Sequence, residues 1–356
     1  MEIEAYFKKV EDLLARSEFE ENTYQGRRED SLGYYNTWME LAWLYIHLSE
    51  VNSLPRNREL IDRLHRHLES IDLSDLDEKR CCTSFLLGVG AVPHLYALTG
   101  GDRVRLVQMF ESTNALASSS EEEDFVFGLC GYVFALIDTE RRCQQKFAGR
   151  DFKLKLLCRL KASIERLLVS EDPLFLGISH GVAGYLPPMV SLSRDLGLDP
   201  DLELIERSIH FITAHSFSDG VCLLVPRESQ TESVQTQGWC HGSPGVLIAL
   251  GYLYDVLRLG YLEPLVTALV QSTLRHRSSL ANYCCGNLGS SMSLLYVHAL
   301  GVVPGLGGEV DRCLELMARE QESSGSGAVF FGDLASDYLK FFREGKVTSL
   351  LGTPLV

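Results

Sequence analysis

The stretch WCHGSPGVLIALGYL, residues 239–253, places two glycines three residues apart at the start of a segment that is apolar nearly all round. A helix with apolar residues on every side is expected to be buried rather than to lie at the surface. Glycine suits the turn before such a helix, because backbones crowd there and glycine also accepts a positive φ. The stretch therefore predicts a tight turn that leads into an inner, buried helix.

The same pattern recurs along the chain, which indicates an internal repeat. Its clearest other copies are VFGLCGYVFALI from residue 126, SHGVAGYLPPMV from residue 179 and YCCGNLGSSMSLLYVHAL from residue 283. Looser copies are LGYYNTWMELAWLYIHL from residue 32, FLLGVGAVPHLYAL from residue 85 and FFGDLASDYLKFF from residue 330. These make seven units, and the spacing between them leaves room for two helices in each.

Amphipathic segments lie between the glycine pairs. In residues 152–168 the apolar residues Phe152, Leu156, Leu160 and Ile164 recur every four positions, which is typical of a helix with one buried face. Residues 60–71 and 204–215 show similar patterns, whereas residues 220–228 could form a small hairpin. The sequence therefore predicts an all-α fold, an α/α toroid of seven inner and seven outer helices, forming a single domain over residues 1–356.

Composition limits the classes of partner and compartment. The chain has 356 residues and a formal net charge of −15, which disfavours binding to nucleic acid and to anionic membranes. Its charged N-terminus lacks the apolar core of a signal peptide, and no run of about 18 apolar residues predicts a transmembrane helix. We therefore expect a cytoplasmic protein whose ten cysteines serve as thiols, metal ligands or packing residues.

The phase of the repeat brings metal-capable side chains together. Cys240 and Cys284 each lie two residues before the first glycine of their units, so they occupy matched positions in consecutive repeats. One residue before that glycine lie His180, His241 and Cys285 in three consecutive units. Equivalent offsets predict equivalent places around the ring. These side chains should therefore meet at one mouth of the fold.

Cys240, Cys284 and Cys285 form a candidate zinc set, with an open fourth position of the kind that catalytic zinc keeps. A thiol that joined such a metal would lose its proton. The spacing matches no zinc finger, and buried cysteines can simply fill space, as the doublet Cys81–Cys82 illustrates. For His180 a core or capping role competes with a catalytic one.

At these residues the sequence resembles the lanthionine synthetase C-like family. The resemblance rests on FLGISHGVAGYL, GWCHGSPGVLIAL and NYCCGNLGSSMSLL, which occur in the family's order. It implies a fold of seven inner and seven outer helices and a zinc ion that activates a thiol. Bacterial members add peptide cysteines to dehydroalanine or dehydrobutyrine, and eukaryotic members are associated with addition of glutathione to dehydroamino acids in damaged proteins.

The resemblance also implies roles for individual residues. Cys240 and Cys284 would be zinc ligands, and Cys285 would replace a histidine ligand. His180 would handle the enolate that forms after thiol addition. His241 is similar to the eukaryotic members, and we include it among the candidate catalytic residues. Asp124, four residues before Gly128, falls where some bacterial cyclases carry an acid that is a candidate catalytic group; a solvated loop or helix-capping acid is the alternative.

The basic residues of the eukaryotic members are not reproduced. Residues 278–282 read SSLAN, and the nearest bases are Arg275 and Arg277, which become the candidates for a glutathione carboxylate. The preferred function is zinc-dependent addition of glutathione to dehydroamino acids. The alternatives are a lanthipeptide cyclase, a non-catalytic scaffold that binds zinc and glutathione, and a toroid without metal. A sugar-processing toroid would need paired carboxylates at the same mouth.

Overall fold

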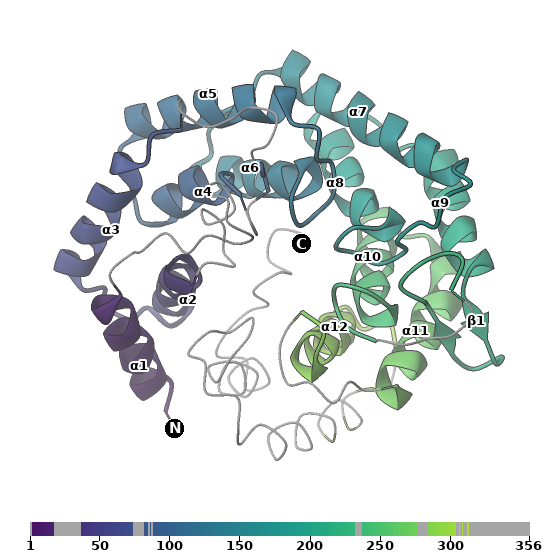
Figure 1. The fold of residues 1–356 in the computed structure, drawn as a ribbon. Helices are drawn as coiled ribbons and strands as arrows, with labels where there is room; N and C mark the ends of the chain where they lie inside the picture. The colour runs from purple at the N-terminus through teal and green to yellow at the C-terminus, as the bar shows by residue number, and fades with distance from the viewer. Residues whose placement is uncertain are drawn as a thin grey trace. The chain divides into compact units, whose positions relative to one another are not determined.

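The computed structural model describes residues 2–17, 37–73, 82–84, 86, 88–231, 237–276, 284–303, 306, 308 and 312. Among these residues the chain forms twelve α-helices, a short 3-10 helix and a two-stranded hairpin (Figure 1). Its internal contacts divide it into two compact units, with the boundary between Cys158 and Arg159. A single domain over residues 1–356 stays a prediction.

The N-terminal unit has two layers of helices. The helices α2, α4 and α6 form the buried layer, in which α4 packs against both α2 and α6. Outside them, α1 packs on α2, whereas α3 and α5 pack on α4 (Figure 1). The helices of this unit, with the one that crosses the boundary, are α1 (Ile3–Arg16), α2 (Thr37–Asn52), α3 (Arg58–Ser70), α4 (Ala91–Leu98), α5 (Arg103–Ser119), α6 (Leu129–Cys143) and α7 (Arg150–Leu168).

The C-terminal unit repeats this arrangement. The buried helix α10 packs against α8 on one side and α12 on the other, while α9 and α11 lie outside α8 and α10. The elements of this unit are α8 (Val182–Asp195), α9 (Leu202–Ala214), β1 (Phe217–Ser218), β2 (Leu223–Leu224), α10 (Ser243–Leu257), η2 (Gly260–Leu262), α11 (Glu263–Arg275) and α12 (Asn287–Ala299). In both units, therefore, glycine-led helices are buried and amphipathic helices cover them.

The periodicity of the sequence explains the two kinds of helix. Helix α10 buries every residue from Ser243 to Leu253, so its apolar surface contacts protein on all sides. Helix α3 buries only Leu60, Leu64 and Leu68, which recur every four residues along one face. The helices predicted in residues 60–71, 152–168 and 204–215 are confirmed as α3, α7 and α9. The seventh glycine unit, at residue 332, lies outside the described residues.

The glycines that precede the buried helices serve mainly to let backbones approach. Gly128, Gly181 and Gly286 have negative φ, and only Gly242 among these four has a positive φ, of 113°. A Cβ atom on Gly181 would lie 2.4 Å from the carbonyl oxygen of Phe175, which is closer than atoms can approach. Crowding therefore requires glycine at Gly181, and backbone conformation requires it at Gly242.

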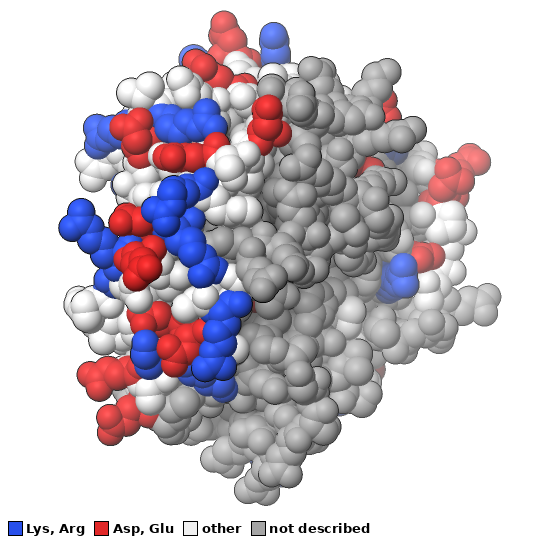
Figure 2. Space-filling view, turned by 60° about the vertical axis from the view of Figure 1, so that its left-hand side comes forward, with Lys and Arg blue, Asp and Glu red and all other residues white. Residues whose placement is uncertain are grey.

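Charge is mixed on the face of the molecule that Figure 2 shows. In Figure 2, Lys and Arg side chains alternate with Asp and Glu, and neither sign forms a large patch of its own. None of the helices in the described ranges combines the length and the apolar character needed to cross a bilayer.

Candidate metal centre

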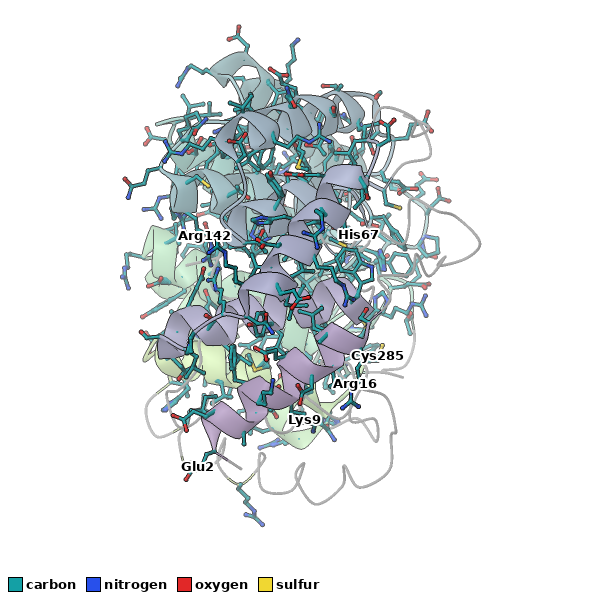
Figure 3. All side chains as sticks on the ribbon, turned by 90° about the vertical axis from the view of Figure 1, so that its left-hand side faces the viewer. Glu2, Lys9, Arg16, His67, Arg142 and Cys285 are labelled. Atoms are coloured by element: carbon teal, nitrogen blue, oxygen red, sulfur yellow. The ribbon has the colours of Figure 1, made fainter. Side chains whose placement is uncertain are left out.

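Three cysteine sulfurs meet in the C-terminal unit, in the loops that lead into α10 and α12. The Sγ atom of Cys285 lies 3.1 Å from that of Cys240 and 3.5 Å from that of Cys284. All three sulfurs lie within 4.8 Å of one another. Cys240 is buried and the other two are half-buried; Figure 3 labels Cys285. Within the described ranges this is the one group of three or more Cys, His, Asp or Glu side chains that could hold a metal ion.

The backbone of the two loops holds this cluster together. The N–H group of Cys240 donates a hydrogen bond to the carbonyl oxygen of Cys284, with a distance of 3.0 Å. Gly238 sits so close to the second loop that a Cβ atom there would lie 2.7 Å from the Cα atom of Cys285. The N–H group of Gly238 also bonds to the carbonyl of His241 at 2.9 Å, which closes a tight turn around Cys240. Cysteines at matched positions of consecutive repeats therefore lie on loops that contact each other directly.

The cluster favours one thiolate and resists a second one. Hydrogen bonds with Cys240 and Cys284 lower the pKa of Cys285 to about 3. The hydrogen bonds with Cys284 and Cys285, together with burial, raise the pKa of Cys240. Three thiols this close therefore share their protons, and a cation is needed before all three can ionise together.

The donor set and its spacing fit a zinc ion. Zinc binds cysteine thiolates tetrahedrally with Zn–S distances of about 2.3 Å, which places two ligand sulfurs about 3.8 Å apart. The two short sulfur–sulfur distances are slightly below this separation, and the upper limit of 4.8 Å lies above it. Small shifts of the half-buried Cys284 and Cys285 would complete the geometry. The described residues supply three candidate ligands, one fewer than the four of a tetrahedral zinc ion.

Two histidine rings and a phenylalanine ring lie next to one another in the same unit. The ring centroids of His180 and His241 are 5.5 Å apart, and Phe175 lies 5.8 Å from the first and 5.4 Å from the second. Burial, with the charge of His180 and Arg227, lowers the pKa of His241 to about 4, so its imidazole is neutral at pH 7. The Nδ1 atom of His241 is buried and has no hydrogen-bond partner among the described residues.

An arginine that sequence analysis did not single out reaches this group. The guanidinium carbon of Arg227 lies 5.2 Å from the centroid of the Phe175 ring. Arg227 follows the hairpin, in which Phe217 pairs with Leu224. The next residue, Glu228, forms a β-bridge with Phe175. A hairpin in residues 220–228 was expected, although its first strand begins earlier, at Phe217.

Comparison with known proteins places the chain in a family. The model of the family described as lanthionine synthetase C-like protein matches residues 5–325, which is most of the chain. The chain belongs to the lanthionine synthetase C-like family. It is 24% identical over 280 residues to the glutathione S-transferase LANCL1 of Danio rerio, a match that covers 71% of this chain and 67% of that protein.

The fold is also that of a solved member. Nisin cyclase superimposes with a TM-score of 0.71, covering 99% of this chain and 96% of the cyclase, at 14% sequence identity. This likeness shows the fold alone. The prediction of an all-α, α/α-toroid fold is confirmed by it.

Three other residues that the lanthionine synthetase C-like resemblance singled out are Asp124, Arg275 and Arg277. Asp124 belongs to the N-terminal unit, where its carboxylate accepts a hydrogen bond from the N–H group of Phe127 at 2.6 Å. Arg275 ends α11, and its guanidinium lies 3.7 Å from the carboxylate of Asp219, with both side chains well exposed. Arg277 lies outside the described residues. The roles predicted for these three residues stay predictions.

Proposed function

We propose that this protein adds a thiol, glutathione in the first place, to dehydroalanine or dehydrobutyrine residues and forms a thioether. The observation that carries this proposal is the cluster of three sulfurs from Cys240, Cys284 and Cys285, beside two histidine rings. The cluster offers a metal three thiolate ligands and leaves one position open. No paired carboxylates are needed, because thiol addition requires a nucleophile and a proton donor and no second acid.

Cys240, Cys284 and Cys285 would hold the zinc ion. When bound there, zinc would lower the pKa of a thiol in the open position, so that its sulfur would be a nucleophilic thiolate at neutral pH. The three protein thiolates would leave the site with a net charge of about −1, which keeps a fourth ligand exchangeable. The half-buried positions of Cys284 and Cys285 leave the site open to a substrate from outside.

His180 is the proposed proton donor. In the reaction a bond forms between the substrate sulfur and the β-carbon of the dehydroamino acid, and the α-carbon then needs one proton. An imidazole can give and take up a proton near neutral pH, which suits this step. The ring of His180 faces that of His241, whose lowered pKa keeps it neutral. We assign His241 to hydrogen bonding with the substrate, because a neutral imidazole retains one donor and one acceptor.

Glutathione is the preferred thiol because of the chain's relatives. The Danio rerio relative is named a glutathione S-transferase, and its match covers about two thirds of that protein. The acceptor would be a protein or peptide that contains a dehydroamino acid. An enzyme that cyclises a peptide through its own cysteine would use the same sulfur chemistry, and the assay below separates the two reactions.

The first test is the metal content of the purified protein, measured by mass spectrometry of the elements. We expect about one zinc per chain in the wild type and less than a quarter of that in Cys285→Ala. Cys158→Ala is the matched control, because Cys158 is an exposed free cysteine on α7 and is not one of the three clustered cysteines. Wild-type protein without metal would refute the zinc site and return the cysteines to a packing role.

The second test is turnover on a peptide that carries one dehydroalanine and one cysteine. Glutathione addition increases the peptide mass by one glutathione, whereas cyclisation leaves the mass unchanged and removes the free thiol. His180→Ala should slow either reaction at least a hundredfold while zinc stays bound. A wild-type protein that holds zinc but converts neither way would be a scaffold, and the enzymatic proposal would fail.

A further inference from the structure

Arg227 is held beside Phe175 by backbone contacts that do not depend on its own side chain. The N–H group of Leu176 donates to the carbonyl of Arg227 at 3.1 Å, and the N–H group of Ser229 donates to the carbonyl of Leu174 at 2.8 Å. Between these bonds, Phe175 and Glu228 form a β-bridge. The segment around Arg227 is therefore fixed along the loop that carries the Phe175 ring.

The guanidinium group of Arg227 lies over the ring of Phe175, which is near both histidines. The centroid of the Phe175 ring lies 5.2 Å from the guanidinium carbon of Arg227 and 5.8 Å and 5.4 Å from the rings of His180 and His241. His241 directly follows Cys240, one of the three clustered cysteines, so this group of rings adjoins the sulfur cluster. Arg227 thus places a permanent cation at the edge of the cysteine and histidine cluster.

Most of the binding capacity of Arg227 remains available. Its described ionic partner is Glu228, 3.5 Å from Nε, and 54% of the Arg227 side chain is exposed. A guanidinium has five N–H donors in a planar fork, and an exposed pair of this kind contributes little to stability. A carboxylate bound by the fork in two places would therefore displace the contact with Glu228 at small cost.

The charge at the site explains why a cation is needed here. Three thiolates around a zinc ion would carry a net negative charge, and a substrate with both a thiolate and a carboxylate would add more. The position of Arg227 offsets this repulsion, whereas Arg275 is engaged with Asp219 at the end of α11.

We propose that Arg227 binds the carboxylate of the thiol substrate and so selects thiols that carry a negative charge. This inference rests on the proposed function, because it supposes that a thiol occupies the cysteine site. It names the class of thiol, one with a carboxylate such as glutathione, and it gives Arg227 the part that the basic residues of the family's eukaryotic members would have.

Two small thiols of equal length test this inference without glutathione and without turnover. The probes are 3-mercaptopropionate, which has a carboxylate, and 3-mercaptopropanol, which has a hydroxyl in its place. Binding of each to the zinc-loaded protein is measured by titration calorimetry at low salt, for wild type, Arg227→Met and Arg227→Lys. Methionine keeps the apolar stem that covers Phe175, and zinc content is checked in each sample.

For each protein we compare the dissociation constant of the hydroxyl thiol with that of the carboxylate thiol. This ratio should be about tenfold larger for wild type than for Arg227→Met, which corresponds to the loss of one charged contact. Because the same two thiols are compared on each protein, differences between the thiols themselves cancel. Arg227→Lys should restore part of the preference. Arg258→Met is the control, since Arg258 is exposed, pairs with Asp255 and should leave the ratio unchanged.

The result separates the two proposals. An equal preference in wild type and Arg227→Met, with both thiols bound, would overturn the role of Arg227 and leave the proposed function standing. Binding of neither thiol to zinc-loaded wild type would overturn the proposed function, and the assignment of Arg227 with it.

Discussion

A single methyl group at Gly238 is expected to disable the metal centre. In the structure, a Cβ atom on Gly238 would lie 2.7 Å from Cα of Cys285, 3.0 Å from its carbonyl carbon and 3.1 Å from the carbonyl oxygen of Cys284. All three are backbone atoms, so no side-chain rotation relieves the contact. Ordinary carbon contacts are about 3.5–4.0 Å, and the Cys284–Cys285 loop would have to retreat by about 1 Å.

A shift of that size exceeds what a zinc site tolerates. Metal–ligand distances in working sites hold to about 0.2 Å, so Gly238→Ala should weaken zinc binding at least tenfold. The same overpacking should cost about 1–3 kcal/mol in the free energy of unfolding. Competition with a chromophoric chelator measures the affinity, and urea denaturation of the metal-free protein measures the stability.

Gly260→Ala is the matched control in the same unit. A Cβ atom at Gly260 meets no atom within 4 Å, and its φ lies outside the left-handed region. This variant should bind zinc as the wild type does and be up to about 1 kcal/mol more stable, since alanine restricts the unfolded chain. If Gly238→Ala folds and keeps wild-type zinc affinity, the contact between the two loops does not define the site, and the reasoning is refuted.

Two further predictions concern buried charges of the N-terminal unit. The ammonium of Lys153 contacts the carboxylate of Glu140, and both side chains are 2% exposed, so Lys153→Met should lower the free energy of unfolding by about 3–5 kcal/mol in urea denaturation. Lys146→Met, which removes an exposed contact to the same carboxylate at 3.3 Å, should cost under about 1 kcal/mol, and equal losses would contradict the argument. Burial opposes ionisation of Asp138, but its hydrogen bond from His94 at 2.8 Å and nearby positive charge lower its pKa below 3.8. The ionised carboxylate therefore stabilises the fold above about pH 4 and loses this effect as the pH falls towards the lowered pKa. Asp138→Asn should lower the free energy of unfolding by about 1.5–3 kcal/mol at pH 7. An equal loss at pH 3 would show that the ionised carboxylate is not the source of this stability.

Much of the fold can be predicted from the sequence because the repeat is local. Glycine pairs mark where backbones crowd, and the period of the apolar residues separates buried from surface helices. The cysteine cluster follows from the same regularity. Cys240 and Cys284 each lie two residues before the first glycine of their repeats, and consecutive repeats pack side by side. Their backbones therefore meet, with a hydrogen bond of 3.0 Å between them.

What the sequence could not predict depends on contacts between non-repeating segments. Arg227 follows a hairpin that the described parts of the other repeats do not contain. The next residue, Glu228, forms a β-bridge with Phe175, 53 positions earlier in the sequence. No offset rule covers such a pairing. The bases nearest to the cysteines in sequence, Arg275 and Arg277, were the natural candidates for that reason.

The same backbone arrangement occurs where two successive pairs of loops meet. We call the contact between residues 177–181 and 240–241 the first junction, and that between residues 238–240 and 284–285 the second junction. The N–H group of Ser179 donates to the carbonyl of Cys240 at 3.3 Å, as that of Cys240 does to Cys284 at 3.0 Å. A Cβ atom added to Gly177 would lie 3.0 Å from the Cα atom of His241. In the same way, a Cβ atom added to Gly238 would lie 2.7 Å from the Cα atom of Cys285. The same packing of loops therefore brings Ser179 towards His241 and Cys240 towards Cys285.

The side chains decide which junction can hold a metal. At the first junction, Ser179 stands where the second has Cys240, and a neutral hydroxyl does not replace a thiolate as a zinc ligand. The Oγ atom of Ser179 and the Nδ1 atom of His241 are both buried without a hydrogen-bond partner in the described residues. At the first junction, therefore, the imidazole of His241 is not part of a three-thiolate group. Repetition of one backbone arrangement with different side chains can therefore give a candidate metal centre and, one repeat earlier, buried polar atoms without a hydrogen-bond partner in the described residues.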